Sequence, residues 1–107
     1  MKIKTWNIEA MTGYKPITTF YEDFSIADNF GMEAVKDTYK RAFETAKFMG
    51  YKELTEFVMA LNWKTWEHYE HNEPLAKLYN DLWEDADFYA NDNLKGEELD
   101  YFYRTID

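Results

Sequence analysis

The sequence predicts an all-α fold, a small antiparallel helical bundle, from three observations. Apolar residues recur at the three- and four-residue spacing of an α-helix along most of the chain after residue 18. Turn signals at Gly50 and at Asn72-Glu73-Pro74 separate the long periodic stretches. The 4 Trp, 9 Tyr and 8 Phe residues supply the apolar surface for a dense core. We therefore expect residues 1–107 to form one domain in which consecutive helices are neighbours.

The first part of the chain, residues 1–18, shows no clean hydrophobic period, and a glycine and a proline interrupt it. We expect an extended arm or loop that packs on the helices, although residues 3–8 also fit a short strand. Thr19 begins a sequence with the form of a helix capping box, and Ser25 begins a similar one. Short helices are therefore predicted within 19–30, as pieces of one or two turns at about 19–24 and 25–30.

Three main helices are predicted from the spacing of the apolar residues that follow. Gly50 ends the first of them, and Asn72 caps the third, whose first turn accepts a proline. A short helix is expected after Gly96. The predicted bounds are about 33–49, 52–71 and 73–94 for the main helices and about 97–106 for the short one.

We expect the second main helix to be the one around which the others pack, because it carries apolar residues on two opposite faces. One face consists of Leu54, Phe57, Val58, Leu61, Thr65, His68 and Tyr69. The opposite face consists of Met59, Trp63 and Trp66. This second face is either core, covered by another part of the chain, or the interface of a structural homodimer.

The distribution of charge predicts the class of partner. Residues 1–52 carry 8 Lys/Arg and 7 Asp/Glu, whereas residues 53–107 carry 4 and 14, so the second half has a net charge of −10. Negative charge repels nucleic-acid phosphates and anionic membranes and attracts basic proteins. We therefore expect a protein partner, basic or DNA-binding, with no direct binding of nucleic acid or membrane.

Cysteine and targeting signals are missing from the sequence. The absence of cysteine excludes disulfides, thiolate metal sites and thiol catalysis. The N-terminus leads into no apolar run typical of a signal peptide, and no stretch approaches the ~18 apolar residues of a membrane span. We expect a cytoplasmic protein.

An acidic stripe on the helix predicted at 73–94 is the candidate partner-binding surface. Carboxylates three or four positions apart on a helix lie about 5–6 Å from one another, close enough to meet a basic groove. The alternative is a solvated face that keeps an aromatic-rich domain in solution. An aromatic residue within the stripe favours binding. The stripe consists of Asp81, Glu84, Asp85, Phe88 and Asp92.

The two histidines suggest an alternative function as a metal-dependent enzyme. His68 and His71 are three positions apart, and Glu67 is four positions from His71, so the three residues could contribute to a metal site completed by another helix. The sequence lacks the HExxH motif and the paired Glu-x-x-His motifs of di-iron bundles. The simpler interpretation is a half-buried His68 and a His71 that interacts with the end of its helix.

Catalytic signatures of other kinds are missing, including a phosphate-binding glycine loop and a GxSxG motif. We assign no catalytic residue and no cofactor, and we expect a non-enzymatic protein.

Two long segments carry a resemblance to known sequences. They are TWNIEAMTGYKPITTFYEDFSIADNFG near the start and NLKGEELDYFYRTID at the end. Together they resemble a family of small uncharacterised proteins encoded on phage-like and conjugative elements of Gram-positive (Firmicutes) gut bacteria. The resemblance implies a bacterial accessory protein of the cytosol and carries no activity, cofactor or site residue. Combined with the acidic stripe, it leads us to expect an interaction or regulatory protein of a mobile element.

Overall fold

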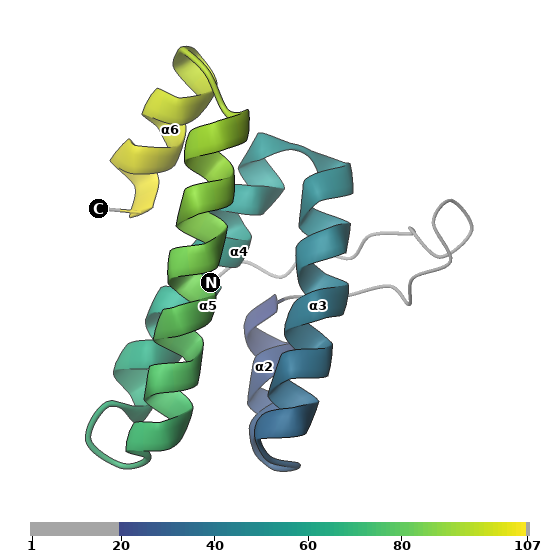
Figure 1. The fold of residues 1–107 in the computed structure, drawn as a ribbon, viewed down its shortest axis with the longest axis vertical. Helices are drawn as coiled ribbons and strands as arrows, with labels where there is room; N and C mark the ends of the chain where they lie inside the picture. The colour runs from purple at the N-terminus through teal and green to yellow at the C-terminus, as the bar shows by residue number, and fades with distance from the viewer. Residues whose placement is uncertain (1–19, 107) are drawn as a thin grey trace.

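The computed structural model describes residues 20–106, which form helices and no strand within that range (Figure 1). The all-α prediction is therefore confirmed, whereas the arm or strand expected within residues 1–18 lies outside the described residues. The helices are α2 (Phe20–Asp28), α3 (Met32–Met49), α4 (Tyr51–His68), α5 (Glu73–Asn93) and α6 (Glu97–Ile106).

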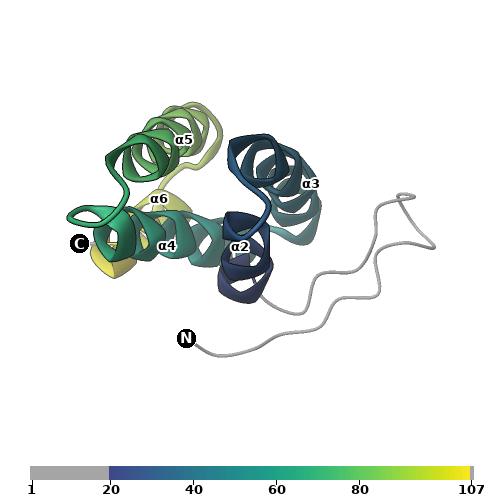
Figure 2. The same cartoon turned by 90° about the horizontal axis from the view of Figure 1, so that it is seen from below.

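The helices are arranged in two layers (Figure 2). Helices α3 and α5 form one layer, and α2, α4 and α6 form the other. Helix α4 packs against each of the other described helices, which confirms its predicted central position. Side chains from α2, α4 and α5 therefore meet inside the molecule, and this meeting point holds the polar cluster described below.

The ends of the main helices follow the local signals in the sequence. Gly50 separates α3 from α4 with a φ of 128°, a conformation that residues with a Cβ rarely adopt. At the start of α5, the Asn72 side chain accepts a hydrogen bond from the Leu75 amide at 3.2 Å, and Pro74 lies in the first turn. Both connections are tight, so α3, α4 and α5 are successive neighbours in space.

Aromatic rings around Phe57 of α4 form the centre of the core. Phe57 is fully buried and stacks on Phe43 of α3, with ring centroids 5.3 Å apart and an interplanar angle of 3°. Phe20 and Phe24 of α2 approach the same ring edge-on at 5.3 and 6.1 Å. Such pairs add stabilisation of about 0.5–1.5 kcal/mol each beyond their buried area. The short helix α2 is thus held against α4 by ring packing.

Two details differ from the expectation. The helical pieces predicted at 19–24 and 25–30 form the single helix α2, because Ser25 does not begin a new helix and its hydroxyl instead accepts a hydrogen bond from Lys64 of α4 at 3.3 Å. Tyr69, expected on the core face of the central helix, is 59% exposed, because α4 ends at His68 and the chain turns away.

Within residues 20–106, no helix is both long and apolar enough to cross a lipid bilayer.

Candidate functional site

A cluster of polar side chains joins α2, α4 and α5 around a buried lysine. Its centre is the amino group of Lys64, whose side chain has no exposed surface. A buried charge is costly unless it is paired and hydrogen-bonded. The cluster, called the Lys64 cluster below, consists of Tyr21, Ser25 and Asp28 from α2, Lys64, Glu67 and His68 from α4, and Tyr79 from α5.

The three N–H groups of the Lys64 ammonium have three acceptors. The ammonium is 2.5 Å from Asp28 Oδ2 and 3.3 Å from the Ser25 hydroxyl, and it forms an ion pair with Glu67 one turn along α4. It also lies over the ring of Tyr21, 5.2 Å from the centroid. This pairing offsets the desolvation of the lysine and connects α4 to α2.

Asp28 receives hydrogen bonds from two further side chains. His68 Nε2 lies 2.7 Å from Asp28 Oδ2, and the Tyr79 hydroxyl donates to Asp28 Oδ1 at 2.7 Å. The His68 and Tyr79 rings are parallel, with centroids 6.0 Å apart and an interplanar angle of 6°. Asp28 is the last residue of α2, where the helix dipole disfavours negative charge. The cationic and hydroxyl donors of α4 and α5 compensate for this position.

The protonation of the cluster follows from these contacts. A hydrogen bond to Glu67, assisted by burial, raises the pKa of Tyr21 to about 12. Burial and the hydrogen bond to Asp28 raise the pKa of Tyr79 above its ordinary value. Burial acts to raise the pKa of Glu67, but hydrogen bonds from Lys64 and Tyr21 outweigh it and lower that pKa. At neutral pH both tyrosines are protonated donors and Glu67 is an ionised acceptor.

The contacts of the Lys64 cluster indicate a structural role, in which it joins α2 to α4 and α5. A catalytic lysine must be able to reach a substrate. Here the Lys64 side chain has no exposed surface, and two carboxylates and a hydroxyl surround its ammonium. The arrangement therefore suits the joining of α2 to α4 and α5 better than catalysis.

The predicted metal ligands are only partly brought together. Ligand atoms of Asp28, Glu67 and His68 lie within 4.8 Å of one another, whereas His71 is exposed in the turn after α4 and is outside this group. Such a carboxylate and imidazole set could ligate zinc or manganese. The Lys64 ammonium, however, lies against both carboxylates, so a divalent ion would have to displace a buried cation.

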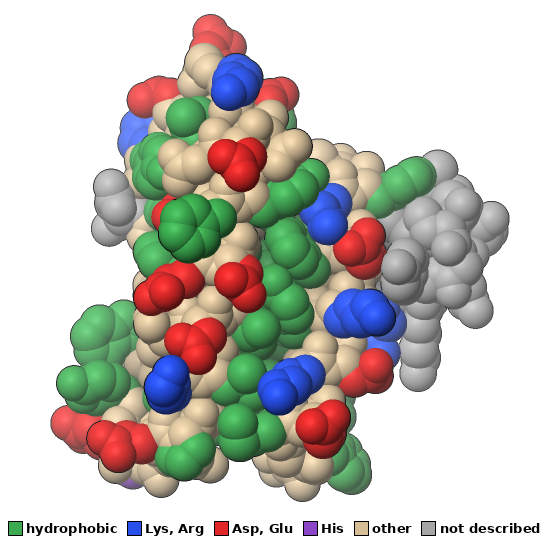
Figure 3. Space-filling view, viewed as in Figure 1, with side chains coloured by type: hydrophobic (Ala, Val, Ile, Leu, Met, Phe, Trp, Pro, Cys, Tyr) green, Lys and Arg blue, Asp and Glu red, His purple; other side chains and the backbone are tan. Residues whose placement is uncertain are grey.

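The residues of the predicted acidic stripe all lie on the solvent side of α5. Asp81, Glu84, Asp85 and Asp92 are exposed, and Phe88 among them is 69% exposed. Figure 3 shows mainly acidic side chains over α5, basic and acidic ones interspersed over α3, and an apolar seam between the two helices. These five residues are called the acidic face below.

The second apolar face of α4 is partly covered. Met59 is half-buried, whereas Trp63 is 45% exposed and Trp66 is 67% exposed. Tyr21 of α2 contacts the Trp63 ring edge-on at 6.1 Å. The described residues therefore cover one end of this face in part and leave Trp66 open.

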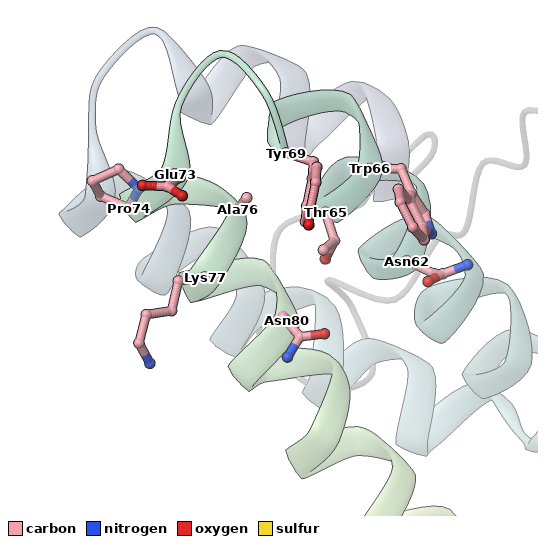
Figure 4. A pocket seen from close by; sticks show the side chains of 9 residues that line it. All are labelled: Asn62, Thr65, Trp66, Tyr69, Glu73, Pro74, Ala76, Lys77 and Asn80. Atoms are coloured by element: carbon pink, nitrogen blue, oxygen red, sulfur yellow. The ribbon is translucent and has the colours of Figure 1, made fainter.

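A groove of about 760 Å³ lies between the C-terminal half of α4 and the start of α5 (Figure 4). Its volume is in the range of small-ligand sites. Trp66 and Tyr69 form its aromatic wall, with ring centroids 5.5 Å apart and an interplanar angle of 42°. This surface, called the aromatic groove below, is lined by Asn62, Thr65, Trp66, Tyr69, Glu73, Pro74, Ala76, Lys77 and Asn80.

Sequence reasoning missed the groove and most of the Lys64 cluster. A lysine in an amphipathic helix is ordinarily exposed, so nothing local marks Lys64 as buried. The signal for the groove was the pair Trp66 and Tyr69, three positions apart, but Tyr69 was expected in the core. The opposite side of the groove comes from α5, at Asn80, so it forms only when α4 and α5 pack together.

Comparison of the chain with known protein families, curated proteins and solved structures found no match.

Proposed function

We propose that this protein is a non-enzymatic interaction module whose acidic face binds a basic segment of another protein. The observation that carries the proposal is Phe88, a residue 69% exposed, among four exposed carboxylates on one side of α5. Aromatic residues at the centre of an interface supply much of the binding energy. The surrounding carboxylates attract a basic partner and determine its orientation.

The charge on α5 supports the same proposal. Lys77 is the only basic residue of this helix, and its ammonium is 3.3 Å from Asp81, four positions along. The remaining carboxylates of the acidic face are therefore not offset by cations on α5. Exposed charges of one sign accelerate association with an oppositely charged partner, and salt screens the effect. Binding should weaken as the salt concentration rises.

The partner is proposed to be a DNA-binding protein in which the basic segment lines a groove that accepts α5 in place of nucleic acid. The regularly spaced carboxylates of the acidic face supply the negative charges that such a groove recognises. The resemblance of the sequence to mobile-element proteins adds the context of a bacterial regulatory or accessory role. In this form, the protein competes with DNA for the partner, and an electrophoretic competition assay without displacement at low salt would contradict it.

The experiment that tests the proposal is affinity capture with two variants of equal charge. One variant neutralises the acidic face (Asp81→Asn, Glu84→Gln, Asp85→Asn), and the other neutralises three exposed carboxylates of α6 (Glu97→Gln, Glu98→Gln, Asp100→Asn). The wild type and the α6 variant should retain the same partner from a lysate, and the acidic-face variant should lose it. Equal capture by all three proteins would refute the role of the acidic face.

A homodimer is the second candidate function, because the described residues leave Trp63 and Trp66 45% and 67% exposed on one face of α4. A dimer formed there would bury both indoles in an apolar interface. Light scattering on the wild type and on Trp66→Ala tests it. A monomer at all concentrations would remove this candidate.

A further inference from the structure

The aromatic groove has a π surface suited to a planar cation. Trp66 is 67% exposed and Tyr69 is 59% exposed, and both rings lie on the α4 side of the groove (Figure 4). A cation positioned over the face of a tryptophan or tyrosine ring is attracted by the ring quadrupole. A guanidinium group also stacks flat on such a ring, because it is planar and weakly hydrated.

The polar groups of the groove include acceptors that match such a cation. Glu73 supplies a carboxylate at one end, and Asn62 and Asn80 supply amide oxygens on the two sides. The amide nitrogen of Asn80 donates to Glu84 at 3.4 Å, which leaves its oxygen for a ligand. A guanidinium carries five N–H donors and no acceptor.

The single cation that lines the groove does not compete for these acceptors. The ammonium of Lys77 is 3.3 Å from Asp81, and in Figure 4 its side chain points away from Trp66 and Tyr69. The groove therefore presents rings, amides and a carboxylate to an entering side chain.

We infer that the aromatic groove binds an arginine side chain of the same basic segment that contacts the acidic face, an inference that rests on the proposed function. The two surfaces adjoin, because Glu84 of the acidic face is hydrogen-bonded to Asn80 of the groove. A segment that crosses α5 can place one basic residue among the carboxylates and an arginine against Trp66. The groove makes the site selective for arginine over lysine, whereas the acidic face accepts either.

The test uses labelled oligoarginine and oligolysine peptides of equal length and charge, with affinities measured by fluorescence anisotropy. The wild type should bind oligoarginine more tightly, by up to about two- to fivefold for each ring that a guanidinium contacts, because an ammonium gains part of the same attraction but does not stack flat on the ring. The double variant Trp66→Ala, Tyr69→Ala should lose this preference, so its affinity should fall more for oligoarginine than for oligolysine. The control Trp63→Ala removes an exposed indole of the same helix outside the groove and should behave as the wild type.

The outcomes separate the inference from the proposed function. Equal affinities of the wild type for the two peptides, or a preference that survives in the double variant, would overturn the arginine site while binding to the acidic face remains. Absence of binding to both peptides would overturn both. Dimerisation of the wild type that the double variant abolishes would assign the groove to a second copy of the chain, which also overturns the inference.

Discussion

Replacement of Lys64 by methionine tests whether the Lys64 cluster holds α2 to the rest of the fold. The substitution keeps an unbranched apolar side chain one atom shorter than lysine and removes the charge. Removal of one partner from a fully buried ion pair costs about 3–5 kcal/mol. Lys64 has no exposed surface, and the Asp28 side chain is 12% exposed, but Asp28 keeps its donors on His68 and Tyr79. The Glu67 side chain is 41% exposed, so water replaces much of its ion pair.

We therefore expect Lys64→Met to lower the free energy of unfolding by about 3 kcal/mol, at the lower end of that range. For a domain of this size the melting temperature should fall by roughly 10–20 °C. Urea titration followed by circular dichroism measures the change. The matched control is Lys77→Met, which removes the charge of a 77% exposed side chain from a surface ion pair. It should change the free energy of unfolding little.

A double-mutant cycle shows whether the loss comes from the charge pair. Asp28→Asn removes the carboxylate charge. The double variant with Lys64→Met should therefore lose less free energy of unfolding than the two single variants lose together, by at least about 1 kcal/mol. If Lys64→Met were as stable as the wild type, or if the losses of the two single variants simply added, the Lys64 cluster would not hold α2 to the rest of the fold.

Three further predictions concern pH, metal and the start of α5. Because folding raises the pKa of Tyr79 and, to about 12, that of Tyr21, the unfolded chain loses these protons first, so stability should fall as pH rises above 10.0, the ordinary pKa. A free energy of unfolding that stays constant above this pH in urea titrations would contradict this. Zinc or manganese should leave the melting temperature of the wild type unchanged. Either ion should raise the melting temperature of Lys64→Ala, because Asp28, Glu67 and His68 lose the lysine ammonium between them. A metal-induced rise in the wild type that is abolished by His68→Ala would instead support the metal site. Asn72→Ala should cost about 1 kcal/mol in a denaturant titration because it removes the cap of α5, and Asn72→Asp, which can still cap, should not; equal losses would show that the cap contributes nothing.

The fold was predictable to the extent that its determinants are local. Gly50 and Asn72 mark helix ends through their own backbone and side-chain chemistry, and the spacing of Leu54, Phe57 and Leu61 defines a buried face within one helix. Ser25 shows where local reasoning fails. Its hydroxyl fits a helix cap, but a lysine from α4 uses it, and α2 continues through this position.

The candidate site was predictable only in part, because its members come from different helices. The adjacent Glu67 and His68 were recognised as possible ligands, but their partner Asp28 lies 40 positions before His68 and reaches them only through packing of α2 on α4. The acidic face was found from the sequence, because it belongs to one helix and lies on its solvent side. The aromatic groove needs both α4 and α5, so the spacing of Trp66 and Tyr69 supplies one wall of it and does not define the groove.

The most direct test of the central claim, that α5 binds a basic protein segment, is a map of amide chemical shifts. The isotopically labelled protein would be titrated with the oligoarginine peptide at low salt. The account predicts shifts concentrated at the acidic face and at the aromatic groove, at residues that include Glu84, Phe88 and Trp66, and their loss in the acidic-face variant. Shifts confined to α3 or α6, or an unchanged map in that variant, would contradict it.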